Sequence, residues 1–338
     1  MAVGAACLAF CLPFAIAAAQ ATRELHVCHA GSLTAAFTDL EQAFARESRS
    51  VHITDTSGGS VDLARRFATG ALECDVFAPA DYLIIERMLT PARLSDFTIR
   101  FAHGRMVLAY VGDDPKAAAL TVTPPWDDRA GHLVPAVTGR WYEALIAPGV
   151  RIAGAHPFLD PGGYRAHMIF ALAEAHYSVP GLNNSLLQHY QVNPASAPAA
   201  VLGKDFNFQF TYEHSAAAAA ATNAAYRYAT LPAEIDLSGD RVLNAAGDIT
   251  IPGLGGKEHA ASVSIPARAV EWGVTIPVRA RNRADAVRFV AALLGPSGRD
   301  ALMRHGPHPL TPARVSAEDH RRVPISLVAL TSIDRARR

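Results

Sequence analysis

The first hundred residues repeat one arrangement of apolar and polar positions. Residues 25–28 and 51–54 are short apolar runs of the kind that form strands. After each run, apolar residues recur every three or four positions, which predicts an amphipathic helix. The two stripes are Leu33, Phe37, Leu40 and Phe44, and then Val61, Ala64, Phe67 and Ala71. With a third strand predicted at residues 75–79, the alternation indicates an α/β fold, doubly wound with right-handed crossovers.

Two further predicted strands, at residues 106–111 and 272–278, mark the places where we expect the chain to pass from one lobe to a second lobe and to return. Residues 106–111 form a strongly apolar strand directly after Gly104, and residues 272–278 form another. The helix expected from Ala284 then packs back on the first lobe. We therefore expect one lobe from residues 23–102 plus 278–325, and a second lobe from residues 103–277.

Two stretches of the second lobe carry a local prediction. Residues 160–165 contain Pro and two Gly, so we expect a turn there, followed by a helix over residues 166–177. Residues 206–212 alternate apolar and polar side chains, which predicts a half-exposed strand.

Small residues and a serine stand between strand and helix in both of the first two units. The two turns are His29-Ala30-Gly31-Ser32-Leu33 and Ser57-Gly58-Gly59-Ser60-Val61. The N-terminus of a helix offers free backbone N–H groups and a positive dipole end, so it can bind an anion. We therefore infer that Ser32 and Ser60 hold one small oxyanion. Taken alone, each serine is more often an ordinary turn residue that caps a helix.

Composition sets limits on the partners of this chain. Its 338 residues suffice for two domains, and 50% hydrophobic with 18% charged content indicates a large core rather than disorder. The formal net charge is +0, so there is no basic footprint for nucleic acid. An anionic small molecule remains compatible, because backbone amides bind anions without formal charge.

Residues 1–22 predict export. The stretch up to Thr22 has no charged residue and is rich in Ala, as in a secretory signal peptide, and we expect a periplasmic protein. A lipid-anchored form is the alternative, through Cys7 or Cys11. The exported chain would keep Cys28 and Cys74, which form either a disulfide or two buried thiols.

A series of motifs, in order along residues 25 to 312, resembles the tungstate/molybdate-binding proteins of ABC importers, in their archaeal-type branch. The motifs are His29 to Leu33, Gly59-Ser60, Ala80-Asp81-Tyr82, Leu159-Asp160-Pro161-Gly162-Gly163-Tyr164-Arg165, Tyr212-Glu213, Leu231 to Ser238, and Gly273 to Pro277. The resemblance implies a periplasmic-binding-protein fold of type II, with two α/β lobes joined by a two-strand hinge. It implies a non-enzymatic receptor, expected to be a monomer without a resident cofactor, that delivers its oxyanion to an ABC transporter permease.

The resemblance also implies four ligand-binding residues. The family's two serines match Ser32 and Ser60, and its two carboxylates match Asp160 and Glu213. The alanine run after Glu213 is about three residues longer than the family pattern, and Gly163 stands where relatives often have Cys. Nearby Asp81 and Tyr82 read as a helix cap and a packing ring. We read Arg165 as a structural pairing residue near the hinge.

A carboxylate facing an oxyanion needs an explanation, because like charges 4 Å apart repel by roughly 4 kcal/mol at an effective dielectric of 20. Either a protonated carboxyl donates a hydrogen bond, or the carboxylate binds the central atom. Molybdenum(VI) and tungsten(VI) can expand from four to six ligands, whereas sulfur in sulfate cannot readily do so. The resemblance implies the second solution, with Asp160 and Glu213 as ligands of the Mo or W centre.

Two alternatives remain at this point. The first is a receptor for another tetrahedral oxyanion, sulfate or phosphate. The second is a secreted serine hydrolase with Ser32 or Ser60 as its nucleophile, which the absence of a Gly-x-Ser-x-Gly elbow disfavours.

Overall fold

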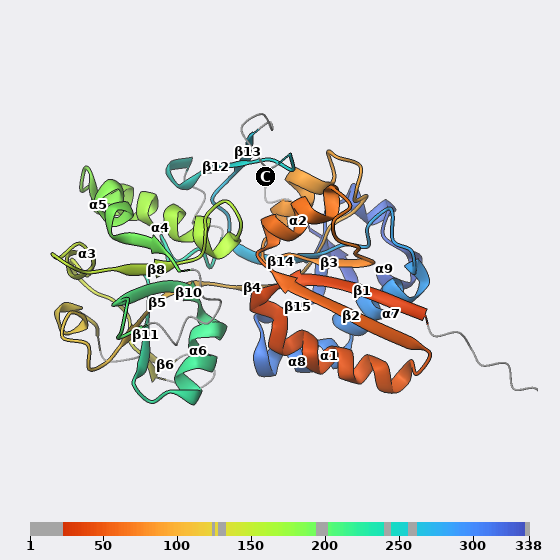
Figure 1. Cartoon of the computed structure of the whole chain (residues 1–338), viewed down its shortest axis with the longest axis horizontal. Helices are drawn as coiled ribbons and strands as arrows, with labels where there is room; N and C mark the ends of the chain where they lie inside the picture. Colours follow the sequence, from red (N-terminus) through yellow and green to blue (C-terminus); the bar gives the residue numbers. More distant parts are fainter. Residues whose placement is uncertain are drawn as a thin grey trace, which may run out of the picture.

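A computed structural model describes residues 23–123, 126–127, 133–193, 202–239, 245–255 and 262–334. Figure 1 shows two lobes side by side, with β4 and β14 where they meet. The predicted signal peptide, residues 1–22, lies outside the described residues. Within the described ranges, no helix combines the length and the apolar character needed to cross a bilayer.

The first lobe begins with the predicted strand–helix repeats. The parallel sheet has the order β2-β1-β3, with β1 at Arg23–Ala30, β2 at Val51–Gly58 and β3 at Val76–Ala78. Helix α1 (Thr34–Glu47) joins the first two strands, and α2 (Ser60–Ala68) follows β2. Their buried residues include the predicted stripes from Phe37 to Phe44 and from Val61 to Phe67, so burial of these faces holds the helices on the sheet. Ala71, predicted to end the second stripe, lies beyond α2 and is exposed.

A second sheet completes this lobe. Its order is β14-β4-β15-β16, and a bridge between Phe77 and Thr275 connects it to the first sheet. The strands are β4 (Ile99–Gly104), β14 (Val270–Val274), β15 (His308–Val315) and β16 (Thr331–Ile333), and the helices are α7 (Arg283–Leu294), α8 (Pro296–His305) and α9 (Ile325–Val328). Helices α7 and α8 pack on α1, so the end of the chain returns to the lobe of its beginning.

The second lobe has a mixed five-stranded sheet of order β11-β5-β10-β8-β9. Its elements are β5 (Met106–Val111), α3 (Tyr142–Leu145), β8 (Ile152–Gly154), α4 (Pro161–Tyr177), α5 (Leu182–His189), β9 (Tyr190–Val192), β10 (Phe208–Tyr212), α6 (Glu213–Thr222) and β11 (Tyr226–Thr230). Two short pairs accompany it, β6 (Trp126–Asp127) with β7 (Leu133–Val134) and β12 (Ile249–Pro252) with β13 (Ser262–Ile265).

The prediction of a half-exposed strand at residues 206–212 was wrong. All five residues of β10 are buried, including Gln209 and Thr211, because the strand lies in the middle of the sheet. The small alanines of α6 cover the face that the alternation assigned to solvent, since Ala216 and Ala219 pack in the core cluster there.

The lobes are linked at two places. The chain passes from β4 through Arg105 into β5, and it returns through β14, which pairs antiparallel with β4. The Met106 N–H donates to the Asp236 carbonyl, and the Val270 N–H donates to the Leu237 carbonyl, so the outgoing and returning segments meet near residues 236–237. The exact boundaries predicted for the lobes stay predictions.

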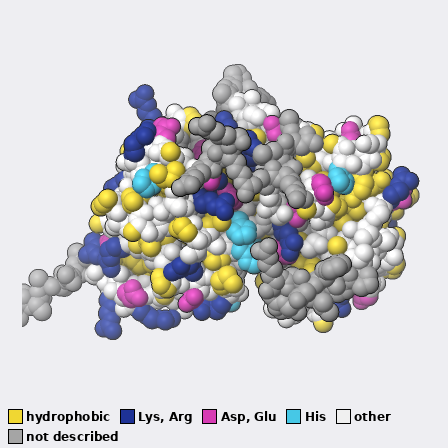
Figure 2. Space-filling view, turned by 180° about the vertical axis from the view of Figure 1, so that it is seen from behind, with side chains coloured by type: hydrophobic (Ala, Val, Ile, Leu, Met, Phe, Trp, Pro, Cys, Tyr) yellow, Lys and Arg dark blue, Asp and Glu magenta, His cyan; other side chains and the backbone are white. Residues whose placement is uncertain are grey.

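Cys28 and Cys74 form a disulfide, with their Cα atoms 5.7 Å apart. The bond joins β1 to the segment before β3 and decides between the two alternatives that the sequence left open. On the face shown in Figure 2, basic and acidic side chains are interspersed rather than gathered by sign, in keeping with the balanced composition.

Candidate functional site

Ser60 is the first residue of α2 and is fully buried. Its Oγ accepts a hydrogen bond of 3.0 Å from the Ala80 N–H, which follows β3. Because this acceptor role fixes the oxygen, the hydroxyl hydrogen is left to donate elsewhere.

The next two amides of α2 are used by the opposite lobe. The N–H groups of Val61 and Asp62 both donate to the Leu159 carbonyl oxygen, at 3.1 and 3.2 Å. We expected the free amides of this helix end to bind the anion, but these two are satisfied by protein backbone. The Ser60 hydroxyl is therefore the more direct candidate for a ligand contact at this turn.

Gly59 allows this close approach of the lobes. A Cβ at this position would lie 2.5 Å from the Leu159 carbonyl oxygen and 3.3 Å from Oδ2 of Asp160. No side chain fits there without moving backbone. The same geometry places the Asp160 carboxyl directly beside the Ser60 turn.

Asp160 caps a helix rather than lying in the turn predicted for residues 160–165. Helix α4 already begins at Pro161, because proline suits the first helical position and Asp160 Oδ1 accepts from the Gly162 N–H at 2.7 Å. Burial raises the pKa of the Asp160 carboxyl above its ordinary value, although the Gly162 amide and the Arg165 charge act in the opposite direction.

Ser32 is held by side chains from two other elements. Its Oγ accepts from the indole Nε1–H of Trp272 on β14 at 3.0 Å, and its carbonyl oxygen lies 3.0 Å from Nε2 of His214 on α6. A carbonyl can only accept, so Nε2 of His214 carries the hydrogen. Burial lowers the pKa of His214 to about 4, despite that hydrogen bond, so the ring is neutral near pH 7.

Glu213 is the first residue of α6, next to His214. Its carboxylate forms an ion pair with the Arg105 guanidinium, and its N–H donates to the Arg105 carbonyl at 3.1 Å. Arg105 is the residue at the crossover between the lobes. The second predicted carboxylate is therefore neutralised by a cation at the hinge.

Buried polar residues connect these positions. Arg165 Nη1 donates to the Ala80 carbonyl and to the Tyr212 hydroxyl, both at 2.8 Å, and Nη2 lies 3.2 Å from Asp81 Oδ2. Tyr164 also donates to Asp81 Oδ2, at 2.7 Å. The pairing role predicted for Arg165 is confirmed.

Asp81 also serves as a cap, because its Oδ1 accepts from the Leu83 N–H at 3.0 Å, as predicted. Tyr82 packs its ring under the Arg100 guanidinium at 5.2 Å and is part of the apolar packing, as predicted. Both residues therefore make the structural contacts that the sequence predicted.

The structure thus places one predicted carboxylate beside a serine turn of the opposite lobe, and the neighbour of the other carboxylate against the second serine turn. Asp160 lies at the Ser60 turn, and the helix of Glu213 contacts the Ser32 turn through His214. Sequence reasoning missed Trp272, His214 and Arg105. Arg105 and Trp272 lie at the two predicted crossings between the lobes, and that position is the signal that could have pointed to them.

Two α/β lobes meet here through polar groups of both, an architecture suited to binding a ligand between them. The match of residues 25–307 makes the chain a member of the bacterial extracellular solute-binding protein family. The predicted fold class is confirmed by solved binding proteins with the same fold. The sulfate-binding protein SubI from Mycobacterium tuberculosis H37Rv has a TM-score of 0.58 and 14% identity, covering 88% of this chain and 90% of its own.

Relatives in sequence cover nearly the whole chain. The molybdate/tungstate-binding protein WtpA from Pyrococcus abyssi is 26% identical over 323 residues, covering 87% of this chain and 86% of the relative. An uncharacterized solute-binding protein from Petrotoga mobilis is 27% identical, covering 86% and 85%. The family and its neighbours are transport binding proteins, so the prediction of a receptor rather than an enzyme is confirmed.

Proposed function

We propose that this protein captures molybdate or tungstate between its lobes outside the cytoplasm and delivers it to the permease of an ABC importer. The observation that carries the proposal is the contact across the lobes at both serine turns: Asp160 lies beside the Ser60 turn, and His214, the neighbour of Glu213, contacts the Ser32 carbonyl oxygen. Two relatives that cover most of the chain, from Pyrococcus abyssi and Thermococcus kodakarensis, are molybdate/tungstate-binding proteins.

The two serines suit the oxo atoms of the ligand. Each Oγ already accepts an N–H, from Ala80 and from Trp272, so each hydroxyl can donate its hydrogen to an anion. Hydrogen bonds to a charged acceptor are the stronger kind, contributing about 1.5–3 kcal/mol each.

The carboxylates suit the central atom. Oδ1 of Asp160 is occupied by the Gly162 amide, whereas Oδ2 faces the Ser60 turn at Gly59. Pairing with Arg105 reduces the repulsion between Glu213 and a dianion. We propose that these oxygens complete the coordination of Mo(VI) or W(VI) and exclude sulfate, whose centre cannot accept them.

Calorimetry on the purified protein tests the proposal. Molybdate and tungstate should bind with dissociation constants in the micromolar range or below, and excess sulfate or phosphate should displace neither. The absence of binding by both metal oxyanions would refute the proposal. Displacement by sulfate would instead identify a receptor for that anion.

The coordinating role of Asp160 has its own test. Asp160→Ala should weaken molybdate binding by about 100-fold and any residual sulfate binding far less, because only molybdate loses a ligand of its centre. Asp62→Ala, the same substitution at an exposed carboxylate on α2, is the matched control and should change neither affinity. Equal losses for both anions in Asp160→Ala would contradict metal coordination.

A further inference from the structure

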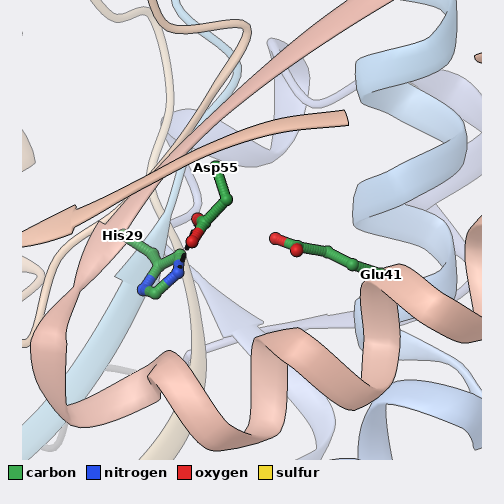
Figure 3. Close-up of side chains that lie close together, drawn as sticks. All are labelled: His29, Glu41 and Asp55. Atoms are coloured by element: carbon green, nitrogen blue, oxygen red, sulfur yellow. Dashed lines mark ion pairs between the residues drawn. The ribbon is translucent and has the colours of Figure 1, made fainter. Parts of the chain in front are cut away.

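A second cluster of ligand-type side chains lies within the first lobe. Figure 3 shows His29 from β1, Glu41 from α1 and Asp55 from β2 directed at one another. One ligand atom from each, an imidazole nitrogen and two carboxylate oxygens, lies within 4.8 Å of the others. None of the three belongs to the oxyanion site proposed above.

His29 presents an unpartnered nitrogen to this cluster. The residue is 1% exposed, and its Nδ1 lies 2.8 Å from the Ala30 carbonyl oxygen, which can only accept, so Nδ1 carries the hydrogen. In the neutral ring, Nε2 then carries a lone pair of electrons and no hydrogen. It lies 2.7 Å from Oδ1 of Asp55, but without the geometry of a hydrogen bond. The Phe37 ring packs against the imidazole, with 4.6 Å between the ring centroids.

Glu41 adds a second buried atom without a partner. Its Oε1 is shielded from solvent and makes no hydrogen bond. Burial, with the nearby Asp55 charge, raises the pKa of Glu41 to about 7, even though His29 acts in the opposite direction. Three side chains that can each donate an electron pair to a metal therefore converge here, and an atom of His29 and an atom of Glu41 have no hydrogen-bond partner among the described residues.

We propose that His29 Nε2, Glu41 and Asp55 bind a divalent transition-metal cation. The charge of a 2+ ion balances two carboxylates, and its bonds satisfy the unpartnered atoms of His29 and Glu41. One imidazole and two carboxylates suit Zn²⁺ or a neighbouring first-row ion, whereas Mg²⁺ and Ca²⁺ prefer ligand sets made of oxygen alone. The Asp55 side chain, 36% exposed, gives the ion a route from solvent.

The position of the cluster gives the ion a structural role. His29 precedes the Ser32 turn on β1, and Asp55 precedes the Ser60 turn on the adjacent parallel strand β2. A cation held by these residues and by Glu41 fastens both strands to α1. The bound ion would then hold in place the two strands that precede the serine turns. This inference does not depend on the identity of the oxyanion.

Titration of Zn²⁺ into EDTA-treated and dialysed protein tests the site. The wild type should bind one equivalent with micromolar affinity or better, and Zn²⁺ should raise its melting temperature. Glu41→Gln and Asp55→Asn, which keep the side-chain shape but remove a ligand oxygen's charge, should each weaken binding at least tenfold. Glu47→Gln is the matched control, because it is the same substitution at an exposed position of the same helix.

Failure of the wild type to bind Zn²⁺ in the micromolar range would overturn the proposal. Equal binding by the wild type and by Glu41→Gln and Asp55→Asn would overturn it too, since the ion would then sit on other residues. Circular dichroism of the metal-free variants confirms folding. If Glu41→Gln does not fold, Asp55→Asn, at a partly exposed side chain, decides. Molybdate titration of the same samples separates failure of this site from failure of the oxyanion site.

Discussion

The turns at Ser32 and Ser60 look alike in sequence, yet different kinds of group hold them. Backbone groups surround the Ser60 turn, with the Ala80 amide on its hydroxyl and the Leu159 carbonyl on the next amides of α2. Side chains hold the Ser32 turn, through Trp272 and His214. The same local pattern therefore produces two different turns. The Ser60 turn depends on the close approach of the other lobe's backbone, and the Ser32 turn depends on which side chains lie next to it.

The sharpest test of this difference uses the glycine before each serine. A Cβ at Gly59 would overlap the Leu159 backbone of the opposite lobe, whereas a Cβ at Gly31 would meet no atom within 4 Å. Gly59→Ala should therefore prevent closure and weaken oxyanion binding by about 100-fold or more, while Gly31→Ala changes it less than threefold. Calorimetry gives both affinities. Equal behaviour of the two variants would remove the distinction between the turns.

Removal of each hydroxyl comes next in size. Ser60→Ala and Ser32→Ala should each weaken oxyanion binding by roughly 30-fold, because each loses a hydrogen bond to a charged acceptor. Each variant also leaves a buried donor without its acceptor, the Ala80 amide in Ser60→Ala and the indole N–H of fully buried Trp272 in Ser32→Ala. Urea unfolding should therefore show both variants to be less stable than the wild type by about 1–3 kcal/mol. A variant as stable as the wild type would contradict the role given to that hydroxyl as an acceptor.

The contact between α2 and the other lobe should respond to Arg65. Its guanidinium donates to the carbonyls of Phe158, Gly253 and Pro252, at 2.7, 3.1 and 2.5 Å. A lysine cannot reproduce that fork, so Arg65→Lys should weaken oxyanion binding by about tenfold through a less stable closed form. Arg66→Lys, on the same helix but paired with exposed Asp62, is the matched control. No difference between the two would argue against a role of Arg65 in closure.

The smallest expected effect concerns acid and the Ser32 turn. In the folded protein His214 stays neutral down to about pH 4, whereas in the unfolded chain it is protonated near pH 6.5. Protonation therefore favours the unfolded chain, and the free energy of unfolding decreases as the pH falls below 6.5. Between pH 8 and pH 6 this amounts to about 0.8 kcal/mol. Urea unfolding should show that the free energy of unfolding of His214→Gln decreases less between pH 8 and pH 6 than that of the wild type, by this amount. An identical pH dependence of both proteins would contradict the assignment, and His176→Gln controls for histidine replacement at an exposed position.

Several helices and strands could be predicted from the sequence, because their apolar periodicity was strong and the predicted elements alternated as they do in an α/β fold. The first stripe lies on α1 after Leu33, the second lies on α2 up to Phe67, and the apolar run after Gly104 is β5. The pattern at residues 206–212 failed because alternation reports polarity, not what packs on the polar face. The small alanines of α6 cover that face.

The candidate site was predictable only in part. Serine turns are local, so their placement at helix starts could be expected, as could a cap role for Asp81. Trp272 and His214 reach Ser32 from 240 and 182 residues away in sequence. Contacts of that kind depend on how the lobes meet, and no spacing along the chain encodes them.

The bond between Cys28 and Cys74 has a consequence for how the molecule comes apart. The closed ring of chain between them contains Ser32 and Ser60, as well as His29, Glu41 and Asp55. A protease that cuts once inside this ring leaves two fragments that migrate as one species until a reductant is added. In the unfolded chain the same ring limits how far the Ser32 turn and the Ser60 turn can separate. The chain therefore samples a smaller volume before the two turns come together during folding.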